Sequence, residues 1–119
     1  MKEKRIEKKK ELKNLKNEEI KALLELKNIL YQKFPIVEFK LFGSKAKNKS
    51  TEESDIDIMI ELEKYNIETE KEIDRIIFEI NLKYNVLISA LIMDRNEIEN
   101  GPMSESPIYK VIQKEGISI

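Results

Sequence analysis

The chain contains no cysteine and no histidine among its 119 residues. These absences exclude disulfide bonds, zinc sites built from Cys and His, thiol nucleophiles and imidazole general bases. Any catalytic chemistry must therefore depend on carboxylates, hydroxyls, lysines or a hard metal ion with oxygen ligands.

Long apolar runs and an excess of one charge are also missing. No stretch approaches the roughly 20 apolar residues of a membrane span, and the N-terminal MKEKRIEKKKELK lacks the apolar centre of a signal peptide. We therefore expect a cytoplasmic protein with no membrane segment. The formal net charge of −1 gives no overall electrostatic reason to expect nucleic-acid binding.

Hydrophobic spacing in the first third of the chain predicts a helix. The residues that fall on the i, i+3/i+4 series, all but one of them apolar, are Ile20, Leu23, Leu24, Lys27, Leu30, Tyr31 and Phe34. Asn17 is placed at its N-cap, and Pro35 ends it because the residue before a proline leaves helical geometry. We expect residues 1–17 to form a lysine-rich helical arm and residues 18–119 to form one domain.

Two segments alternate between apolar and polar residues and are predicted to be strands. In PIVEFKLFG, Val37, Phe39 and Leu41 share one face. In SDIDIMIEL, the core face carries Ile56, Ile58, Ile60 and Leu62, and the opposite face carries Asp55, Asp57, Met59 and Glu61.

The rest of the chain continues this alternation of elements. A helix over about Ile67 to Tyr84 has one apolar stripe, and VLISALIM is typical of a strand covered on both faces. After the turn-rich residues 94–106, a helix from Pro107 to a C-cap at Gly116 precedes a short strand, ISI. The predicted fold is an α+β sandwich, with helices packed against one small sheet.

Asp55 and Asp57 are candidate metal ligands. Side chains two apart on a strand share a face, with Cα atoms about 6.6 Å apart, so both carboxylates can reach one divalent cation. Mg²⁺ suits such a pair because it fills its remaining positions with water and phosphate oxygens. The alternative is that both acids face solvent on an ordinary strand.

Gly43 and Ser44 are a candidate phosphate-binding turn. Glycine lets the backbone turn sharply or approach a ligand closely, and the serine offers a hydroxyl donor. Lys45 and Lys47 add positive charge beside it. The alternative is an ordinary strand-to-helix turn capped by serine.

Together these residues carry a family resemblance. Gly43-Ser44, ten intervening residues and Asp55-Ile56-Asp57 resemble the G-S-x10-D-x-D signature of the DNA polymerase β-like nucleotidyltransferase superfamily, and the chain is similar in size and element order to its minimal nucleotidyltransferase (MNT) domains. The resemblance implies a small mixed sheet and transfer of a nucleoside monophosphate, usually AMP from ATP, to a hydroxyl. It also implies that Asp55 and Asp57 are catalytic and hold one or two Mg²⁺ ions, while the Gly43–Lys47 turn binds the triphosphate.

Two features depart from the family pattern. Family members commonly carry arginines where Lys45 and Lys47 stand, and lysine keeps the charge without the bidentate geometry. Active members usually place a third carboxylate on the next strand, but VLISALIM has none, and Leu87 or Ser89 stands nearest the expected place. Asp94 lies past the end of that strand, and Glu61 shares the face of Asp55 and Asp57 but lies two positions beyond Met59, so neither is a clean substitute.

Two functions remain open. By resemblance, the chain is an MntA-like antitoxin of a HEPN/MNT pair, which silences a HEPN-type toxin by adenylylating one of its tyrosines. Alternatively, it is a catalytically weak or inactive module that binds nucleotide or a partner and neutralises that partner by contact, which the missing carboxylate favours. The apolar run VLISALIM fits either an internal core or a homo- or hetero-oligomeric interface.

Overall fold

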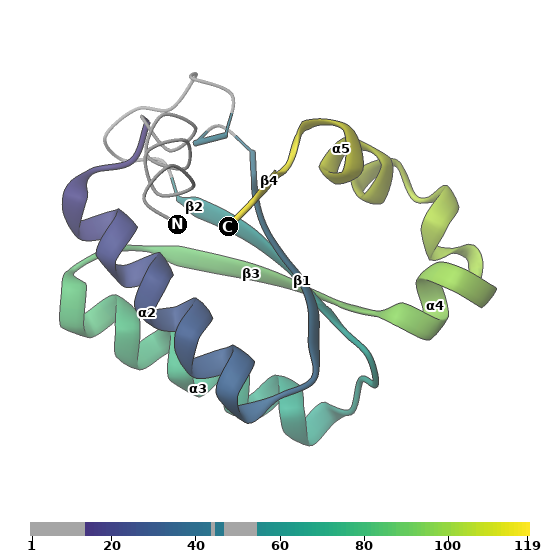
Figure 1. The fold of residues 1–119 in the computed structure, drawn as a ribbon, viewed down its shortest axis with the longest axis horizontal. Coiled ribbons are helices and arrows are strands. Elements are labelled where there is room, and N and C mark those ends of the chain that lie inside the picture. Colours follow the sequence, from purple (N-terminus) through teal and green to yellow (C-terminus); the bar gives the residue numbers. More distant parts are fainter. Residues whose placement is uncertain (1–13, 44, 47–54) are drawn as a thin grey trace.

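The computed structural model describes residues 14–43, 45–46 and 55–119. Their elements are α2 (Asn17–Lys33), β1 (Ile36–Phe42), β2 (Ile56–Leu62), α3 (Ile67–Tyr84), β3 (Ile88–Asp94), α4 (Arg95–Asn100), the 3-10 helix η1 (Pro102–Glu105), α5 (Pro107–Glu115) and β4 (Ile117–Ser118). Figure 1 shows α2 and α3 to one side of a small sheet and α4 and α5 to the other. The predicted α+β fold is confirmed.

The sheet has the strand order β3-β2-β1-β4. β1 pairs antiparallel with β2 and with β4, whereas β2 and β3 are parallel. Parallel neighbours need a long crossover, and α3 supplies it. The mixed character of the sheet therefore follows from one helical crossover between two strands that run in the same direction.

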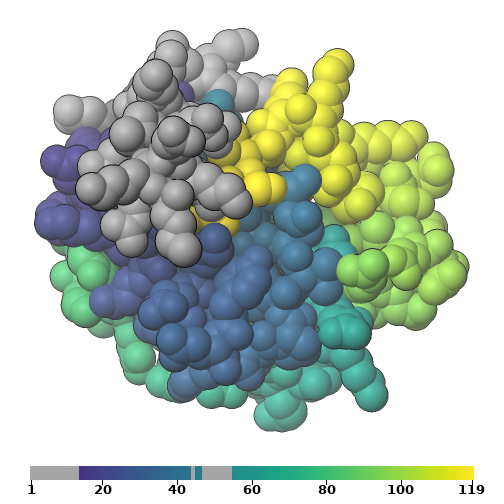
Figure 2. Space-filling model, viewed as in Figure 1, coloured from purple at the N-terminus to yellow at the C-terminus, as the bar shows by residue number. Residues whose placement is uncertain are grey.

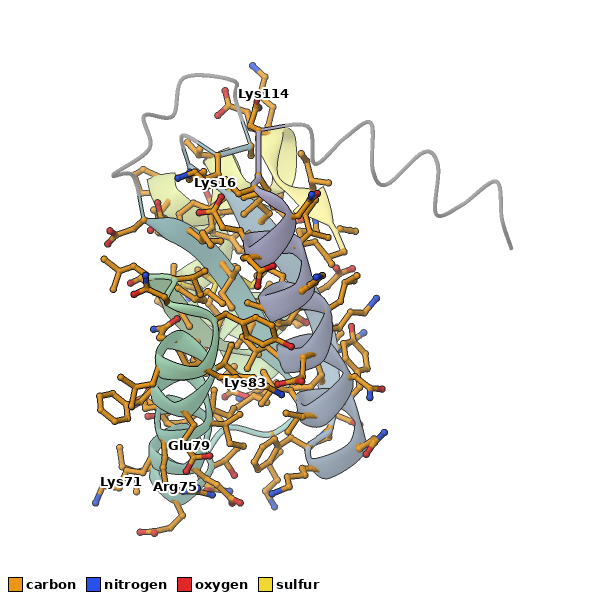
Figure 3. All side chains as sticks on the ribbon, turned by 90° about the vertical axis from the view of Figure 1, so that its left-hand side faces the viewer. Lys16, Lys71, Arg75, Glu79, Lys83 and Lys114 are labelled. Carbon is orange, nitrogen blue, oxygen red and sulfur yellow. The ribbon has the colours of Figure 1, made fainter. Side chains whose placement is uncertain are left out.

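The inner face of the sheet packs against α2 and α3 and forms the main core. Its fully buried side chains include Leu23, Leu26 and Leu30 of α2, Ile73 of α3, and Ile56, Ile58, Ile60 and Leu62 of β2. Figure 3 shows the two helices side by side, with Lys83 between them. Lys83 Nζ lies 2.7 Å from Glu25 Oε1, and this pair joins the exposed edges of α3 and α2.

The outer face of the sheet carries a second, smaller apolar cluster of Met59, Met93, Ile98 and Ile112. These side chains come from β2, β3, α4 and α5, so the C-terminal helices cover part of this face. In Figure 2 the yellow C-terminal segment lies against the blue surface of β1 and beside the green surface of α4. On this outer face Asp57, near the start of β2, is only half-buried, whereas Met59 in the middle of the strand is buried.

Several sequence predictions need correction in α2. The helix begins at Asn17, so Lys16 is the N-cap, and the backbone N–H of Lys16 donates to Glu19 Oε1 at 2.8 Å. Leu24 and Tyr31 are 48% and 44% exposed. Ala22 and Leu26 are fully buried instead, because the face of α2 that meets the sheet is rotated from the predicted stripe.

The strands also differ from expectation. The pairing of β1 with β2 shifts between Ile36 and Glu38, so Ile36 rather than Val37 packs against the main core. Met59 and Glu61 lie opposite the main core, as predicted, but they are also buried, because α4 and α5 cover their end of the sheet. The segment predicted as turns contains α4 and η1. β3 begins at Ile88, and Leu87 before it is 58% exposed.

No helix in the described part of the chain combines the length and the apolar character that crossing a membrane requires.

Candidate active site at the open end of β2

The candidate site lies on the outer face of the sheet, where strand pairing sets three side chains in a row. Asp57 of β2 pairs with Phe42 of β1 on one side and with Ser89 of β3 on the other. Paired residues share a face, so Phe42, Asp57 and Ser89 stand next to one another. The row beyond it contains the fully buried Met59, which closes the site on that side.

Asp55 and Asp57 differ in their environments. Asp55 precedes β2 and is exposed, whereas Asp57 is half-buried within the strand. Burial raises the pKa of the Asp57 carboxyl, and the nearby charge of Asp55 raises it further. A pair of carboxylates in this state gains from a bound cation, which would neutralise both charges at once.

Gly43 lies directly against the Asp57 carboxylate. Its φ of +73° falls in the left-handed region that favours glycine. A Cβ placed on Gly43 would stand 2.6 Å from Asp57 Oδ2, closer than real side chains come. The glycine and the second aspartate of the signature are therefore in contact, although 13 residues separate them in the chain.

The turn that follows Gly43 is closed by a hydrogen bond from Ala46 N to Gly43 O at 3.1 Å. Lys45 within it is only 2% exposed, and its Nζ lies 3.4 Å from Glu19 Oε2. The structure thus places the Lys45 ammonium beside a carboxylate of α2, and its predicted contact with a triphosphate stays a prediction. Ser44 and Lys47 lie outside the described residues.

The position of a third carboxylate is occupied by Ser89. Of the two residues that the sequence placed nearest this position, Ser89 is exposed and directly opposite Asp57, whereas Leu87 precedes β3. Glu61 lies four residues further along β2, and Asp94 pairs with Leu62 while its Oδ1 accepts from Tyr65 N at 3.3 Å. Across residues 14–43, 45–46 and 55–119, no group of three acidic side chains is placed to hold a metal.

This donor set fits one Mg²⁺ ion better than two. Mg²⁺ is commonly held by one or two carboxylates, with water and substrate phosphates completing its octahedron. Asp55 and Asp57 meet that need, and Ser89 offers a neutral hydroxyl where a second ion would gain most from a carboxylate. The site therefore fits a nucleotide that brings its own phosphate ligands.

Sequence reasoning missed one side chain that contacts this site. Glu19 is 7% exposed and reaches Lys45 from the first turn of α2. The sequence does not indicate this contact, because the helix dipole already explains an acidic residue in the first turn of a helix.

Comparison with known proteins agrees with this geometry. Residues 23–119 match the family described as "Nucleotidyltransferase domain". The chain belongs to this family, whose general chemistry is nucleotidyl transfer.

A relative from Methanocaldococcus jannaschii is 49% identical over 49 residues and bears the name "Putative protein adenylyltransferase". The similarity covers 40% of this chain and 49% of the relative, so the chain matches about half of that protein's length.

Proposed function

We propose that this domain is a Mg²⁺-dependent nucleotidyltransferase that moves AMP from ATP to a hydroxyl group. The observation that carries the proposal is the contact between Gly43 and Asp57, which brings the two halves of the signature together. Membership of the nucleotidyltransferase family and the name of the archaeal relative support it.

The reaction forms one bond and breaks another at the α-phosphorus of ATP. The acceptor oxygen bonds to that phosphorus, pyrophosphate leaves with the electron pair of the broken bond, and the hydroxyl proton passes to solvent. Bound Mg²⁺ supplies neutralisation of charge on the leaving group. Asp55 and Asp57 would hold the ion through their carboxylates, and Gly43 lets the main chain pass close to Asp57. Ser44 and Lys47 are proposed to contact the phosphates.

Calorimetric titration of the chain with ATP and Mg²⁺ tests the site. We expect binding by the unaltered protein and loss of binding in Asp57→Asn, because the asparagine removes a charged ligand. Asp74→Asn is a matched control, since burial also raises the pKa of the Asp74 carboxyl but this residue lies on α3. Equal binding by Asp57→Asn and the unaltered chain would contradict the assignment.

We further propose that the acceptor is a tyrosine of a HEPN-type toxin, with this domain as the antitoxin. Exposed apolar side chains on and after α3 support a protein partner: Phe78 is 62% exposed, Leu82 68% and Leu87 58%. Capture with the tagged chain from its native cell should recover a HEPN-type protein. Leu82→Glu should lose it, and Lys71→Glu at the other end of α3 should retain it. Failure of the unaltered chain to recover such a protein argues against the partner.

Ser89 opposite Asp57 favours a second candidate, a nucleotide-binding module that neutralises its partner by contact alone. Electron paramagnetic resonance with Mn²⁺ in place of Mg²⁺ separates the two. Transfer of AMP to the partner, with one or two bound ions per chain in the presence of ATP, supports the enzyme. One bound ion, together with no transfer of AMP to the partner, supports the module.

A further inference from the structure

The Glu19–Lys45 pair is the most deeply buried ion pair among the described residues. The side chains are 9% and 2% exposed, with 3.4 Å between Lys45 Nζ and Glu19 Oε2. The other ion pairs found in this part of the chain have side chains that are 31% to 78% exposed. Exposed pairs contribute little to stability, whereas a buried pair that loses one partner leaves a charge without compensation.

This pair joins the signature turn to the start of α2. Glu19 is held from both sides, because its Oε1 accepts from Lys16 N at 2.8 Å while its Oε2 faces Lys45. Asn14 Nδ2 donates to the carbonyl of Lys45 at 3.3 Å, which adds a second link from the same region. On its other side the turn begins at Gly43, against Asp57. The turn is thus fixed between α2 and the candidate metal ligand.

We propose that Glu19 is a positioning residue for nucleotide binding, and that it acts by holding Lys45 and so fixing the Gly43–Ala46 turn above Asp57. In this arrangement the Lys45 ammonium anchors the turn to α2 and is not a ligand of the triphosphate. The inference rests on the proposed function, since the turn is the part of the signature expected to meet the phosphates.

Glu19→Gln tests the anchor with minimal change of shape. The glutamine keeps an oxygen for the N–H of Lys16 but removes the charge that faces Lys45. We expect Mg-ATP affinity to fall on the order of tenfold, below the roughly 100-fold loss that a 1 Å misplacement in an active site can cause. Glu18→Gln is the matched control, because Glu18 is the neighbouring residue and its pair with Lys21 is exposed.

The double variant Glu19→Gln/Lys45→Met separates anchoring from direct phosphate binding. It removes both buried charges, and neutral replacement of a buried ion pair is often tolerated. We expect it to recover most of the affinity lost in Glu19→Gln, while Lys45→Met alone stays weak because it strands the Glu19 carboxylate. A double variant that is folded but binds as weakly as Lys45→Met would overturn the proposal and assign Lys45 to the triphosphate.

Hydrogen exchange at the Ala46 amide provides a readout that needs no nucleotide. This amide closes the turn through its bond to Gly43 O, so it should exchange faster in Glu19→Gln and return toward the original rate in the double variant. The Glu63 amide, which donates to Pro35 O at the opposite end of β1 from the turn, should not change. An unchanged Ala46 rate in Glu19→Gln refutes the anchor, whereas absence of ATP binding by the unaltered chain refutes only the proposed function.

Discussion

Gly43→Ala is predicted to damage stability and the candidate site together. Alanine must adopt the left-handed conformation at φ +73°, which costs an L-residue about 1–2 kcal/mol. Its Cβ would stand 2.6 Å from Asp57 Oδ2, so the carboxylate must move by about 0.8 Å to reach the 3.4 Å of ordinary contact. The carboxylate of Asp57 is thereby displaced from the position that it holds against Gly43.

The two consequences have separate magnitudes. The backbone term alone should lower the midpoint of thermal unfolding by roughly 3–10 °C for a domain of this size. Displacement of a catalytic group by about 1 Å can cost on the order of 100-fold, so we expect Mg-ATP affinity to fall by roughly 10- to 100-fold. Thermal unfolding with and without Mg-ATP measures both effects in one series.

Asn85→Ala is the comparison that isolates the backbone term. Asn85 also has a left-handed conformation, with φ +52°, but it lies at the C-cap of α3. It should lose a similar amount of stability and keep its response to Mg-ATP. If Gly43→Ala loses no more stability than Asn85→Ala and binds Mg-ATP normally, Gly43 does not contact the Asp57 carboxylate in the way described.

Three further predictions concern other side chains. Ser89→Asp should strengthen Mn²⁺ binding in the presence of ATP and destabilise the metal-free chain, because it sets a third carboxylate opposite Asp57. Calorimetry with and without metal measures both effects, and unchanged Mn²⁺ binding would contradict the strand register. Burial raises the pKa of the Glu61 carboxyl in the folded chain. Ionisation of Glu61 therefore lowers the free energy of unfolding increasingly as the pH rises from the pKa of the unfolded state to that of the folded state. Glu61→Gln should therefore be more stable than the unaltered chain at pH 7, and the gain should vanish in urea titrations in acid; a loss of stability at pH 7 would be the opposite result. Lys83→Met should lower the unfolding midpoint slightly at low salt and leave it unchanged at high salt, because the bond of Lys83 to Glu25 is exposed; a loss that persists at high salt would show that packing is responsible.

The long-range architecture was predictable from hydrophobic spacing. The helix Ile67–Tyr84 has the predicted bounds because its apolar stripe from Ile73 to Tyr84 repeats over about three turns and Asn66 accepts a capping bond from Thr69 N. The short helix α4 was missed, since six mostly polar residues carry little periodic signal. Its i, i+4 pair of Arg95 with Glu99, at 2.9 Å, was the available clue.

The candidate site was predictable in part. The sequence narrowed the residue opposite the aspartates to Leu87 or Ser89, and the strand register decides for Ser89. The closeness of Gly43 to Asp57 agrees with the signature. The partner of Lys45 was not predictable, because any of 23 acidic residues could have paired with it and Glu19 lies 26 positions away. The burial of Glu61 also depended on tertiary cover, which strand alternation alone does not reveal.

Transfer of label from ATP tests the central claim most directly. The chain, Mg²⁺ and the protein captured with it are incubated with ATP labelled on either the α- or the γ-phosphate. Nucleotidyl transfer predicts label on the acceptor from the α-phosphate and none from the γ-phosphate, with loss of transfer in Asp55→Asn/Asp57→Asn. Transfer from the γ-phosphate, or α-label that persists without both carboxylates, would contradict the assignment of this site.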